Sequence, residues 1–200
     1  MILPGSHEWH AERAKRLTAS QFGAALGLHP YCSPQKLWRI KLGLETVDTN
    51  HHMQRGMDNE LQALYDYQVE TGHWVDKAGL LVHPAHDWLA CTPDGLVGDR
   101  GLVEVKAPIK IRAEVPEYHL AQVQGQLEIA DRDWCDYVQW KGAEEAGFIV
   151  VGELRIVRTA RDREWWERAF PVLKKFWSFV QSMEPPPRGF ANRERESREK

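Results

Sequence analysis

The sequence has few cysteines and no long apolar segment. Its three cysteines, Cys32, Cys91 and Cys135, lie far apart and form no Cys-x-x-Cys pair. This argues against a disulfide framework and a structural zinc site, and it indicates a reducing compartment. No apolar run approaches the length of a membrane span, and residues 1–13 lack the apolar region of a signal peptide. We therefore expect a soluble, cytoplasmic protein that does not bind membranes.

A strong excess of one charge is also missing. The 200 residues carry a formal net charge of −3, with 28% charged side chains. No global basic field indicates a nucleic-acid partner, although a local groove can be basic on an acidic protein. The sequence does contain 42% hydrophobic residues and nine Trp, enough for one substantial core. We expect a single domain over residues 1–183 and a flexible tail, rich in proline and charge, over 184–200.

The spacing of apolar residues and turn signals predicts helices at both ends of the chain and strands between them. Ser33 before Pro34, with Gly43 past the end, is a typical helix start and stop. Strands with helices on both sides indicate an α+β fold with a central mixed β-sheet flanked by helices. The predicted helices cover 7–15, 20–27, 34–42, 55–72, 117–130 and 162–183 (kinked or restarted at Pro171), and the predicted strands cover 79–83, 88–97, 101–108, 134–140 and 147–158. The apolar residues of helix 55–72 are Met57, Leu61, Leu64 and Tyr65.

Two acids and a lysine lie on what is predicted to be the middle of the sheet. Asp94 precedes Glu104 by ten positions, and Lys106 follows two residues later. Side chains alternate along a strand, so Glu104 and Lys106 share one face and Val103 and Val105 the other. A tight turn in the Gly- and Asp-rich segment between the acids would bring them together as a site for a hard cation such as Mg²⁺. The alternative is an exposed edge hairpin with a solvated Glu–Lys pair.

These residues resemble a known nuclease signature. Pro93-Asp94 followed by Glu104-Val105-Lys106 is similar to the PD-(D/E)xK motif. The surrounding blocks narrow the resemblance to lambda exonuclease-like (YqaJ-type) phage recombination nucleases, since they occur in the same order there. The resemblance covers about residues 9–140 and implies a PD-(D/E)xK, restriction-endonuclease-like core. The blocks are EWHAERAKRLTASQFGAALG, RGMDNELQA, TPDGLV…GLVEVKAP and YHLAQVQGQLEI.

The resemblance implies a metal site. Asp94 and Glu104 would bind the catalytic Mg²⁺, with the backbone carbonyl of Val105 as a further ligand. Lys106 would position or activate the attacking water. Glu60 matches the family's helix acid, which helps to form the metal site directly or through water. Two Mg²⁺ ions per site are implied, and Mn²⁺ would substitute, because a transition state rich in negative charge needs cations.

A pocket for the 5′-phosphate of a DNA end is implied as well, made by Arg13, Ser20 and Thr92. Ser20, predicted as the N-cap of helix 20–27, offers a hydroxyl beside free backbone N–H groups, a natural anion site. Without the resemblance it would be a simple helix cap. Arg13 would supply a forked charged donor, and Arg16 is a second candidate that spacing alone does not distinguish. The family often has Ser where Thr92 stands, and this change keeps the hydroxyl.

The stretch AQVQGQ places Gln122 and Gln126 on one helical face and turns Gln124 away. The resemblance favours Gln122 as an active-site residue that contacts the scissile phosphate or the metal-bound water. The alternative is a partly exposed helix that happens to be rich in glutamine. The aromatic run from Trp165 to Phe179 is expected to pack on the sheet or on another subunit.

As a whole, the resemblance implies a Mg²⁺-dependent 5′→3′ exonuclease of a bacterial cell, phage or prophage. It would degrade one strand of linear double-stranded DNA to mononucleotides and leave 3′ overhangs for recombination by strand annealing. A homotrimeric ring and a single-strand annealing partner protein are also implied; a ring would tether the enzyme without a dense basic patch. Two alternatives stay open: another PD-(D/E)xK enzyme such as an endonuclease, or a non-catalytic DNA-end-binding module. A Cas4-like nuclease is disfavoured because the cysteine cluster for an iron–sulfur centre is missing.

Overall fold

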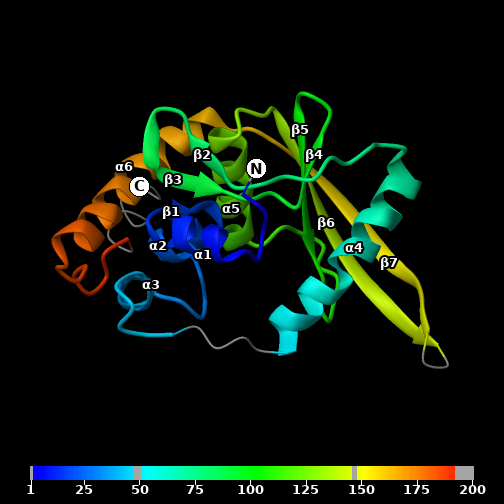
Figure 1. Ribbon diagram of the computed structural model, residues 1–200, viewed down its shortest axis with the longest axis horizontal. Helices are drawn as coiled ribbons and strands as arrows, with labels where there is room; N and C mark the ends of the chain where they lie inside the picture. The colour runs from blue at the N-terminus through cyan, green and yellow to red at the C-terminus, as the bar shows by residue number, and fades with distance from the viewer. Residues whose placement is uncertain (1, 47–50, 146–147, 192–200) are drawn as a thin grey trace.

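The computed structural model describes residues 2–46, 51–145 and 148–191, with the backbone alone at 51–58 and around the tip of the last hairpin. Strands lie at the centre with helices around them, which confirms the predicted architecture (Figure 1). No helix in these ranges is both long and apolar enough to cross a membrane. The helices are α1 (His7–Ala14), α2 (Phe22–Ala25), α3 (Pro34–Lys41), α4 (His51–Thr71), α5 (Glu117–Ile129) and α6 (Arg163–Ser182).

The strands form two mixed sheets. In the larger sheet the order is β4-β5-β6-β7, with β5 and β6 parallel and the other pairs antiparallel; in the smaller it is β1-β3-β2, with β1 and β3 parallel. The helix α5 makes the crossover between the parallel strands β5 and β6, as a parallel pair requires. The strands are β1 (Leu17–Thr18), β2 (Leu81–His83), β3 (His86–Cys91), β4 (Gly95–Val97), β5 (Gly101–Lys106), β6 (Trp134–Glu145) and β7 (Phe148–Ala160).

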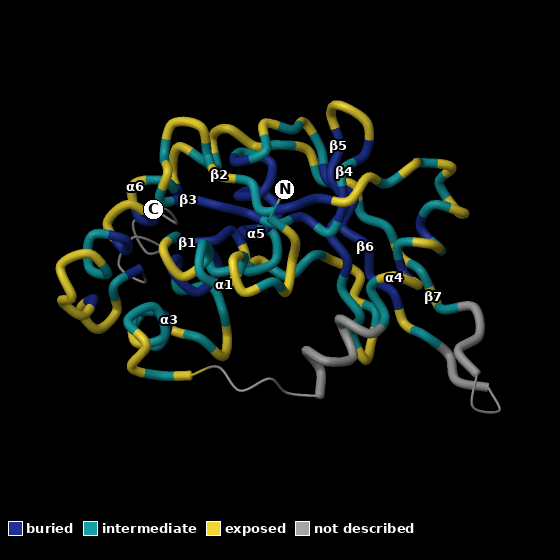
Figure 2. Tube along the Cα trace, viewed as in Figure 1, coloured by how far each residue is buried: buried dark blue, intermediate teal, exposed yellow. Residues whose placement is uncertain are grey.

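The two faces of the larger sheet pack on different helices. Val103 of β5 packs with Tyr67 of α4 on one face, whereas Leu102 packs with Val123 of α5 on the other. Alternation along β5 therefore turns Glu104 toward α5 and, as the sequence predicts, away from the face of Val103 and Val105. Figure 2 shows β5, β6 and much of α5 as buried chain at the centre of the molecule.

Local sequence signals set several helix ends. The Oγ of Ser33 accepts a hydrogen bond from the backbone N of Lys36 at 3.2 Å, and Pro34 is the first residue of α3. Gly43 follows the helix with φ +70°, a conformation that favours glycine. The prediction for this helix is confirmed, because its cap residues act locally.

The start of the second helix differs from the prediction. A 3₁₀ turn, η1 (Ala19–Gln21), leads into α2, and the N-cap is Thr18. The side-chain Oε1 of Gln21 accepts from the backbone N of Thr18 at 3.2 Å, as in a capping box. Ser20 lies inside the turn, so its prediction as the N-cap is wrong. The capping box of Thr18 and Gln21 starts the turn two residues before Ser20 and satisfies free backbone groups there.

The helix α4 turns another face to the sheet than the apolar pattern predicts. Of the apolar residues in that pattern, Leu61 and Tyr65 are 79% and 60% exposed, while Leu64 is partly buried against the core. Ala63 and Tyr67 are fully buried instead, because a small side chain and a flat ring allow the helix to approach the sheet closely. The side chain of Met57, predicted on the same stripe, lies outside the described residues.

The C-terminal helix α6 runs without a break through Pro171, so the predicted restart there is wrong. The Oδ1 of Asp162 accepts from the backbone N of Trp165 at 2.8 Å and caps the helix. The aromatic side chains pack inward: the ring of Trp177 stacks on Trp88 of β3 with centroids 6.2 Å apart. Packing of these side chains on a sheet is confirmed.

Residues 184–191 pack against the helices, although the sequence predicts a flexible tail from residue 184. The Nε2 of Gln35 donates to the backbone O of Pro187 at 2.8 Å. The ring of Phe190 lies 5.4 Å from that of Phe179, and Ala191 is buried. These contacts involve the described residues 184–191; residues 192–200 lie outside the described ranges, so the flexible tail stays a prediction.

Candidate active site

The β4–β5 hairpin brings Asp94 next to β5. Gly95 pairs with Val103, and the chain reversal lets the backbone N of Val105 donate to Asp94 Oδ2 at 2.6 Å. Glu104 is 2% exposed, and Lys106 Nζ lies 2.5 Å from its Oε1. The alternative of a solvated edge hairpin is wrong, because β5 lies between β4 and β6 and buries its acid.

The charges at this hairpin perturb one another strongly. Burial raises the pKa of the Asp94 carboxyl well above its ordinary value, and the charges of Glu104 and Glu60 raise it further. Burial by itself lowers the pKa of Lys106, but Glu104 and Asp94 outweigh this, and the pKa of Lys106 is raised. Lys106 is therefore protonated at neutral pH, in a pocket that disfavours the ionised form of Asp94.

Glu60 of α4 belongs to the same electrostatic group. Burial raises the pKa of its carboxyl, and the negative charge of Glu104 raises it further, while Lys106 and Lys77 act in the opposite direction. Three carboxylates are therefore within electrostatic range of one another: Glu60 on α4, Asp94 between β3 and β4, and Glu104 on β5. The acid predicted on the helix is thus within electrostatic range of the predicted metal residues.

The three carboxylates of Glu60, Asp94 and Glu104 suit a divalent cation, because they supply negative charge and oxygen ligands. Crowded carboxylates that oppose each other's ionisation are stabilised by a hard cation with oxygen ligands. Among the described residues, no three His, Cys, Asp or Glu side chains already stand as a metal cluster. The oxygens of Glu104 are held by Lys106, Gln122 and Gln126. A cation would take Glu104 by displacing some of these hydrogen bonds.

Two glutamines of α5 hold Glu104. Gln122 Nε2 donates to Glu104 Oε1 at 2.5 Å, and Gln126 Nε2 donates to Glu104 Oε2 at 2.6 Å. The buried Oε1 of Gln126 has no hydrogen-bond partner in the described part of the chain. Gln124 turns away, as predicted, and donates to the backbone O of Ala160. Gln122 is predicted from the sequence as a site residue and Gln126 is not, although the spacing of four residues that puts both on one helical face is a signal for Gln126 as well.

The residues predicted to bind a phosphate gather around Trp9. Arg13 Nη2 donates to Ser20 Oγ at 3.3 Å, and Trp9 Nε1 donates to Thr92 Oγ1 at 3.0 Å. The guanidinium of Arg13 lies 4.2 Å from the centre of the Trp9 ring. Burial lowers the pKa of Arg13, and the charge of Glu104 acts against this, so the pocket is within electrostatic range of the acids. Trp9 is not predicted as a site residue from the sequence, because a Trp on a short helix carries no functional signal of its own.

Arg16, the second candidate for the phosphate pocket, points elsewhere. Its Nε donates to the backbone O of Asp87 at 2.8 Å, and its Nη1 forms an ion pair with Glu12. These contacts tie the Arg16 side chain to β3 and to α1. The structure therefore places Arg13, and not Arg16, beside Ser20.

Lys41 holds the end of the helix that carries Arg13. Its Nζ donates to the backbone O of Arg13 at 3.0 Å and to that of Arg16. Burial, with a contribution from the positive charge of Arg13, lowers the pKa of Lys41 to about 7. Lys41 is not predicted as a functional residue from the sequence, because a lysine in the last turn of a helix is ordinarily solvated.

Comparisons with known proteins identify the family to which the chain belongs. The model of the YqaJ-like viral recombinase domain matches residues 8–133. Uncharacterized protein R354 of Acanthamoeba polyphaga mimivirus is 28% identical over 158 residues, which cover 68% of this chain and 29% of that protein. Uncharacterized protein YqaJ of Bacillus subtilis (strain 168) is 24% identical over 184 residues, which cover 86% of this chain and 55% of that protein. The chain thus spans about a third to a half of the length of these relatives.

Solved structures show the same fold. An alkaline exonuclease (LHK-Exo) from Laribacter hongkongensis superposes with a TM-score of 0.75 at 25% identity, covering 97% of this chain and 99% of that chain. A second structure of LHK-Exo, in complex with dAMP, superposes with a TM-score of 0.72. The resemblance predicted from the sequence is confirmed. Since the family model matches more than half of the residues, the chain belongs to the YqaJ-like viral recombinase domain family.

Proposed function

We propose that this chain is a Mg²⁺-dependent exonuclease that degrades one strand of linear double-stranded DNA in the 5′→3′ direction. It releases mononucleotides and leaves 3′ overhangs for recombination by single-strand annealing. The convergence of Asp94, Glu104 and Lys106 at the β4–β5 hairpin carries the proposal. The name alkaline exonuclease and the dAMP complex of LHK-Exo support the release of nucleoside monophosphates.

The roles of the residues follow from their chemistry. Asp94, Glu104, Glu60 and the Val105 carbonyl hold two Mg²⁺ ions, which Mn²⁺ replaces. When bound, the metal supplies Lewis acidity to a phosphoryl oxygen and lowers the pKa of a water molecule. Lys106, kept protonated by the neighbouring acids, orients the attacking water and offsets the charge that develops on the phosphate.

The phosphate pocket supports the direction of cleavage. The guanidinium of Arg13 and the hydroxyls of Ser20 and Thr92 offer charge-assisted and neutral hydrogen bonds to a terminal 5′-phosphate. The charge of Glu104 reaches Arg13, so a phosphate held there lies near the acids. A DNA end held in this pocket would place its first phosphodiester bonds close to the acids, which supports cleavage at the 5′ terminus.

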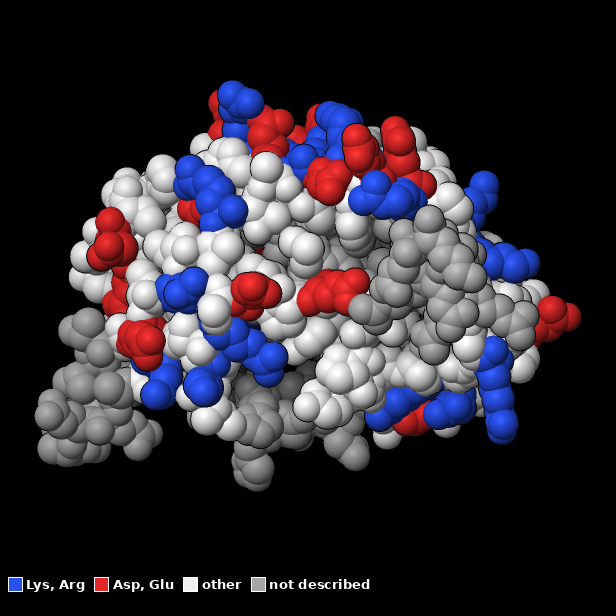
Figure 3. All heavy atoms as spheres, turned by 180° about the vertical axis from the view of Figure 1, so that it is seen from behind, with Lys and Arg blue, Asp and Glu red and all other residues white. Residues whose placement is uncertain are grey.

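We include a homotrimeric ring and a single-strand annealing partner in the proposal. An apolar stripe on α4, Leu61, Tyr65 and Val69, stands 79%, 60% and 67% exposed at a spacing of four residues, which supports a contact with another subunit. The face seen in Figure 3 carries Lys, Arg, Asp and Glu side by side, with no large field of one sign. A ring that encircles DNA retains it without such a field.

The experiment uses purified protein, Mg²⁺ and three DNAs: linear duplex with 5′-phosphate, the same duplex with 5′-hydroxyl, and closed circular plasmid. We expect EDTA-sensitive release of mononucleotides from the phosphorylated linear duplex, with the circle left intact. Asp94→Ala and Lys106→Ala abolish cleavage and retain some DNA binding. Cutting of the circle would establish an endonuclease, and end binding without any cleavage would establish a non-catalytic module.

A further inference from the structure

A cleft of about 1260 Å³ opens where β5 ends, directly after Lys106. Its walls are the loop 107–117, together with Tyr31 and Leu120. Gln139 of β6 is the ladder partner of Lys106, so this loop passes over the same face of the sheet as the acidic site. The lining of the cleft thus begins at Ala107, the residue next to Lys106 of the acidic site.

The loop is held in place by the sheet. Gln139 is 1% exposed, and its amide bonds both backbone groups of Arg112: Oε1 accepts from N and Nε2 donates to O, each at 2.9 Å. Arg155 Nη2 donates to the backbone O of Ala113 at 2.8 Å. A buried amide that clamps one residue of a loop fixes the direction in which that residue's side chain leaves the surface.

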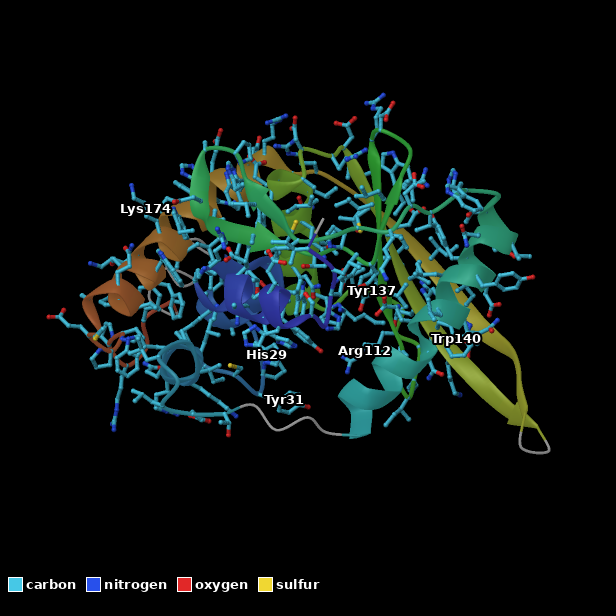
Figure 4. All side chains as sticks on the ribbon, in the orientation of Figure 1. His29, Tyr31, Arg112, Tyr137, Trp140 and Lys174 are labelled. Carbon is cyan, nitrogen blue, oxygen red and sulfur yellow. The ribbon has the colours of Figure 1, made fainter. Side chains whose placement is uncertain are left out.

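The opposite wall presents an aromatic ring to solvent. Tyr31 is 81% exposed, and Ile109 across the cleft is 61% exposed. The backbone N of Tyr31 donates to His29 Nδ1 at 3.2 Å, and the ring of His29 lies 4.8 Å from that of Tyr118 on α5. Figure 4 shows His29, Tyr31 and Arg112 on the same side of the molecule, below Tyr137. Two large apolar groups are held in water here, which the packing of the fold does not require.

Two cations complete the cleft. Lys110 and Arg112 are exposed on the loop, and neither side chain forms a hydrogen bond or ion pair with the residues that the structure describes. Glu114 and Glu117 lie further along the same wall. Free cations next to an exposed aromatic ring are the combination with which proteins bind unpaired nucleotides: the cations attract phosphates and the ring stacks on a base.

We propose that this cleft, lined by Tyr31, Ile109, Lys110 and Arg112, binds the uncut DNA strand as a single-stranded 3′ overhang. The proposal rests on the proposed function. Bases in a duplex are already paired and stacked, so an exposed ring and an aliphatic side chain recognise only unpaired ones. The cut strand leaves as mononucleotides, and the uncut strand is therefore the one single strand that persists as the reaction proceeds.

The test measures binding in EDTA, where no cleavage occurs, with fluorescently labelled duplexes that carry a 5′-phosphate. One duplex is blunt, one has a 3′ extension of the uncut strand, and one has a 5′ extension of the cut strand. We expect the wild-type chain to bind the 3′-extended duplex about tenfold more tightly than the blunt one, as stacking of a base on an aromatic ring contributes. Tyr31→Ala removes most of this ratio, and Tyr31→Phe, which keeps the ring, retains it.

Arg112→Ala is a second variant. It should reduce the ratio of affinities for the 3′-extended and the blunt duplex, and also the dependence of that ratio on salt concentration. Lys174→Ala is the matched control: this exposed lysine lies on α6 at the far end of the molecule in Figure 4, so the ratio stays as in the wild type. Equal binding of the blunt and 3′-extended duplexes, or a ratio that survives Tyr31→Ala, would overturn the proposal. A Tyr31-dependent gain for the 5′ extension alone would assign the cleft to the cut strand and overturn it too. Cleavage of the blunt duplex in Mg²⁺, measured separately, tests the proposed function.

Discussion

Gln126 Nε2 donates a hydrogen bond to Glu104 Oε2 at 2.6 Å, and the two side chains are 1% and 2% exposed. Gln122, one turn earlier on α5, holds the other oxygen of the same carboxylate. A carboxylate supported in this way is oriented before a metal ion arrives, and such supporting residues affect metal affinity without touching the metal. Gln126 is in this sense a positioning residue for Glu104.

Gln126→Leu should weaken Mg²⁺ binding by about 10- to 100-fold, the range seen when a ligand loses its supporting hydrogen bond. The measurement is the Mg²⁺ concentration at which the melting temperature rises, read beside the Mg²⁺ dependence of cleavage. Gln124→Leu is the control, because Gln124 bonds Ala160 and Asp162 and not Glu104. It should lower stability and leave the Mg²⁺ midpoint unchanged. An unchanged midpoint for Gln126→Leu would remove the positioning role.

Asp94→Asn should raise the melting temperature in EDTA at pH 8 by roughly 2–4 °C. The Asn amide oxygen can still accept the hydrogen bond from Val105 N. Burial and the charge of Glu104 disfavour the ionised form of Asp94, and the uncharged amide avoids this cost. Because the folded-state pKa of Asp94 is raised, its contribution to stability is complete below the unfolded pKa and is lost as pH rises through the folded pKa. The advantage of the variant should therefore shrink toward pH 4 in a series of thermal melts. A variant less stable than the wild type at pH 8 contradicts the expectation.

Arg13→Gln should reduce the preference for 5′-phosphorylated over 5′-hydroxyl ends by about tenfold or more, as expected when a hydrogen bond to a charged group is lost. The measurement is the ratio of cleavage rates on the two ends, which cancels any change in the folded fraction. Arg16→Gln is the matched control. Arg16 bonds Asp87 and Glu12, so this variant should lose some stability and keep the ratio. If both variants lose the preference equally, the pocket is not at Arg13.

Lys41→Met should change how stability depends on pH. The pKa of Lys41 is lowered to about 7 in the folded chain, whereas an unfolded lysine titrates near about 10.4. Between these values the unfolded state binds the proton more strongly, so the contribution of Lys41 to stability increases as pH rises from about 7. Urea denaturation at pH 7, 8 and 9 should show the difference between wild type and variant growing by up to about 1 kcal/mol per pH unit. A difference that stays flat would mean that Lys41 remains charged in the fold.

Leu61→Glu combined with Tyr65→Glu should reduce the molecular mass in solution from that of a trimer to that of a single chain. Both side chains are exposed on α4, so the isolated fold tolerates a charge there, whereas an apolar contact between subunits does not. Light scattering after gel filtration gives the mass. Leu44→Glu, at another exposed leucine, is the control and should keep the wild-type mass. A wild-type chain that is already monomeric would refute the proposed ring.

The sequence is informative where the structure is governed by neighbours along the chain. The β4–β5 hairpin follows from its Gly- and Asp-rich turn, and the alternation of side chains then places Glu104 and Lys106 on one face. The helix α3 begins and ends where Ser33 and Gly43 predict, since caps bond groups only a few residues away. The same local chemistry also misleads. Ser20 is a residue type that often caps helices, yet Thr18 is the N-cap, because Thr18 and Gln21 have the spacing of a capping box.

Contacts between segments that are distant in the sequence could not be predicted from turn, cap and alternation patterns. Which face of α4 is buried depends on the shape of the sheet beneath it, so Tyr67 is inside and Tyr65 is outside. The hydrogen bond from Gln126 to Glu104 requires α5 to lie across β5. The hydrogen bond from Trp9 to Thr92 requires α1 to lie near the end of β3. The sequence by itself determined the chemical groups, their family and the hairpin that joins two of them. Only the tertiary structure decided which arginine meets Ser20, which glutamine supports Glu104 and which ring faces the cleft, because packing and burial act between residues that the chain order keeps far apart.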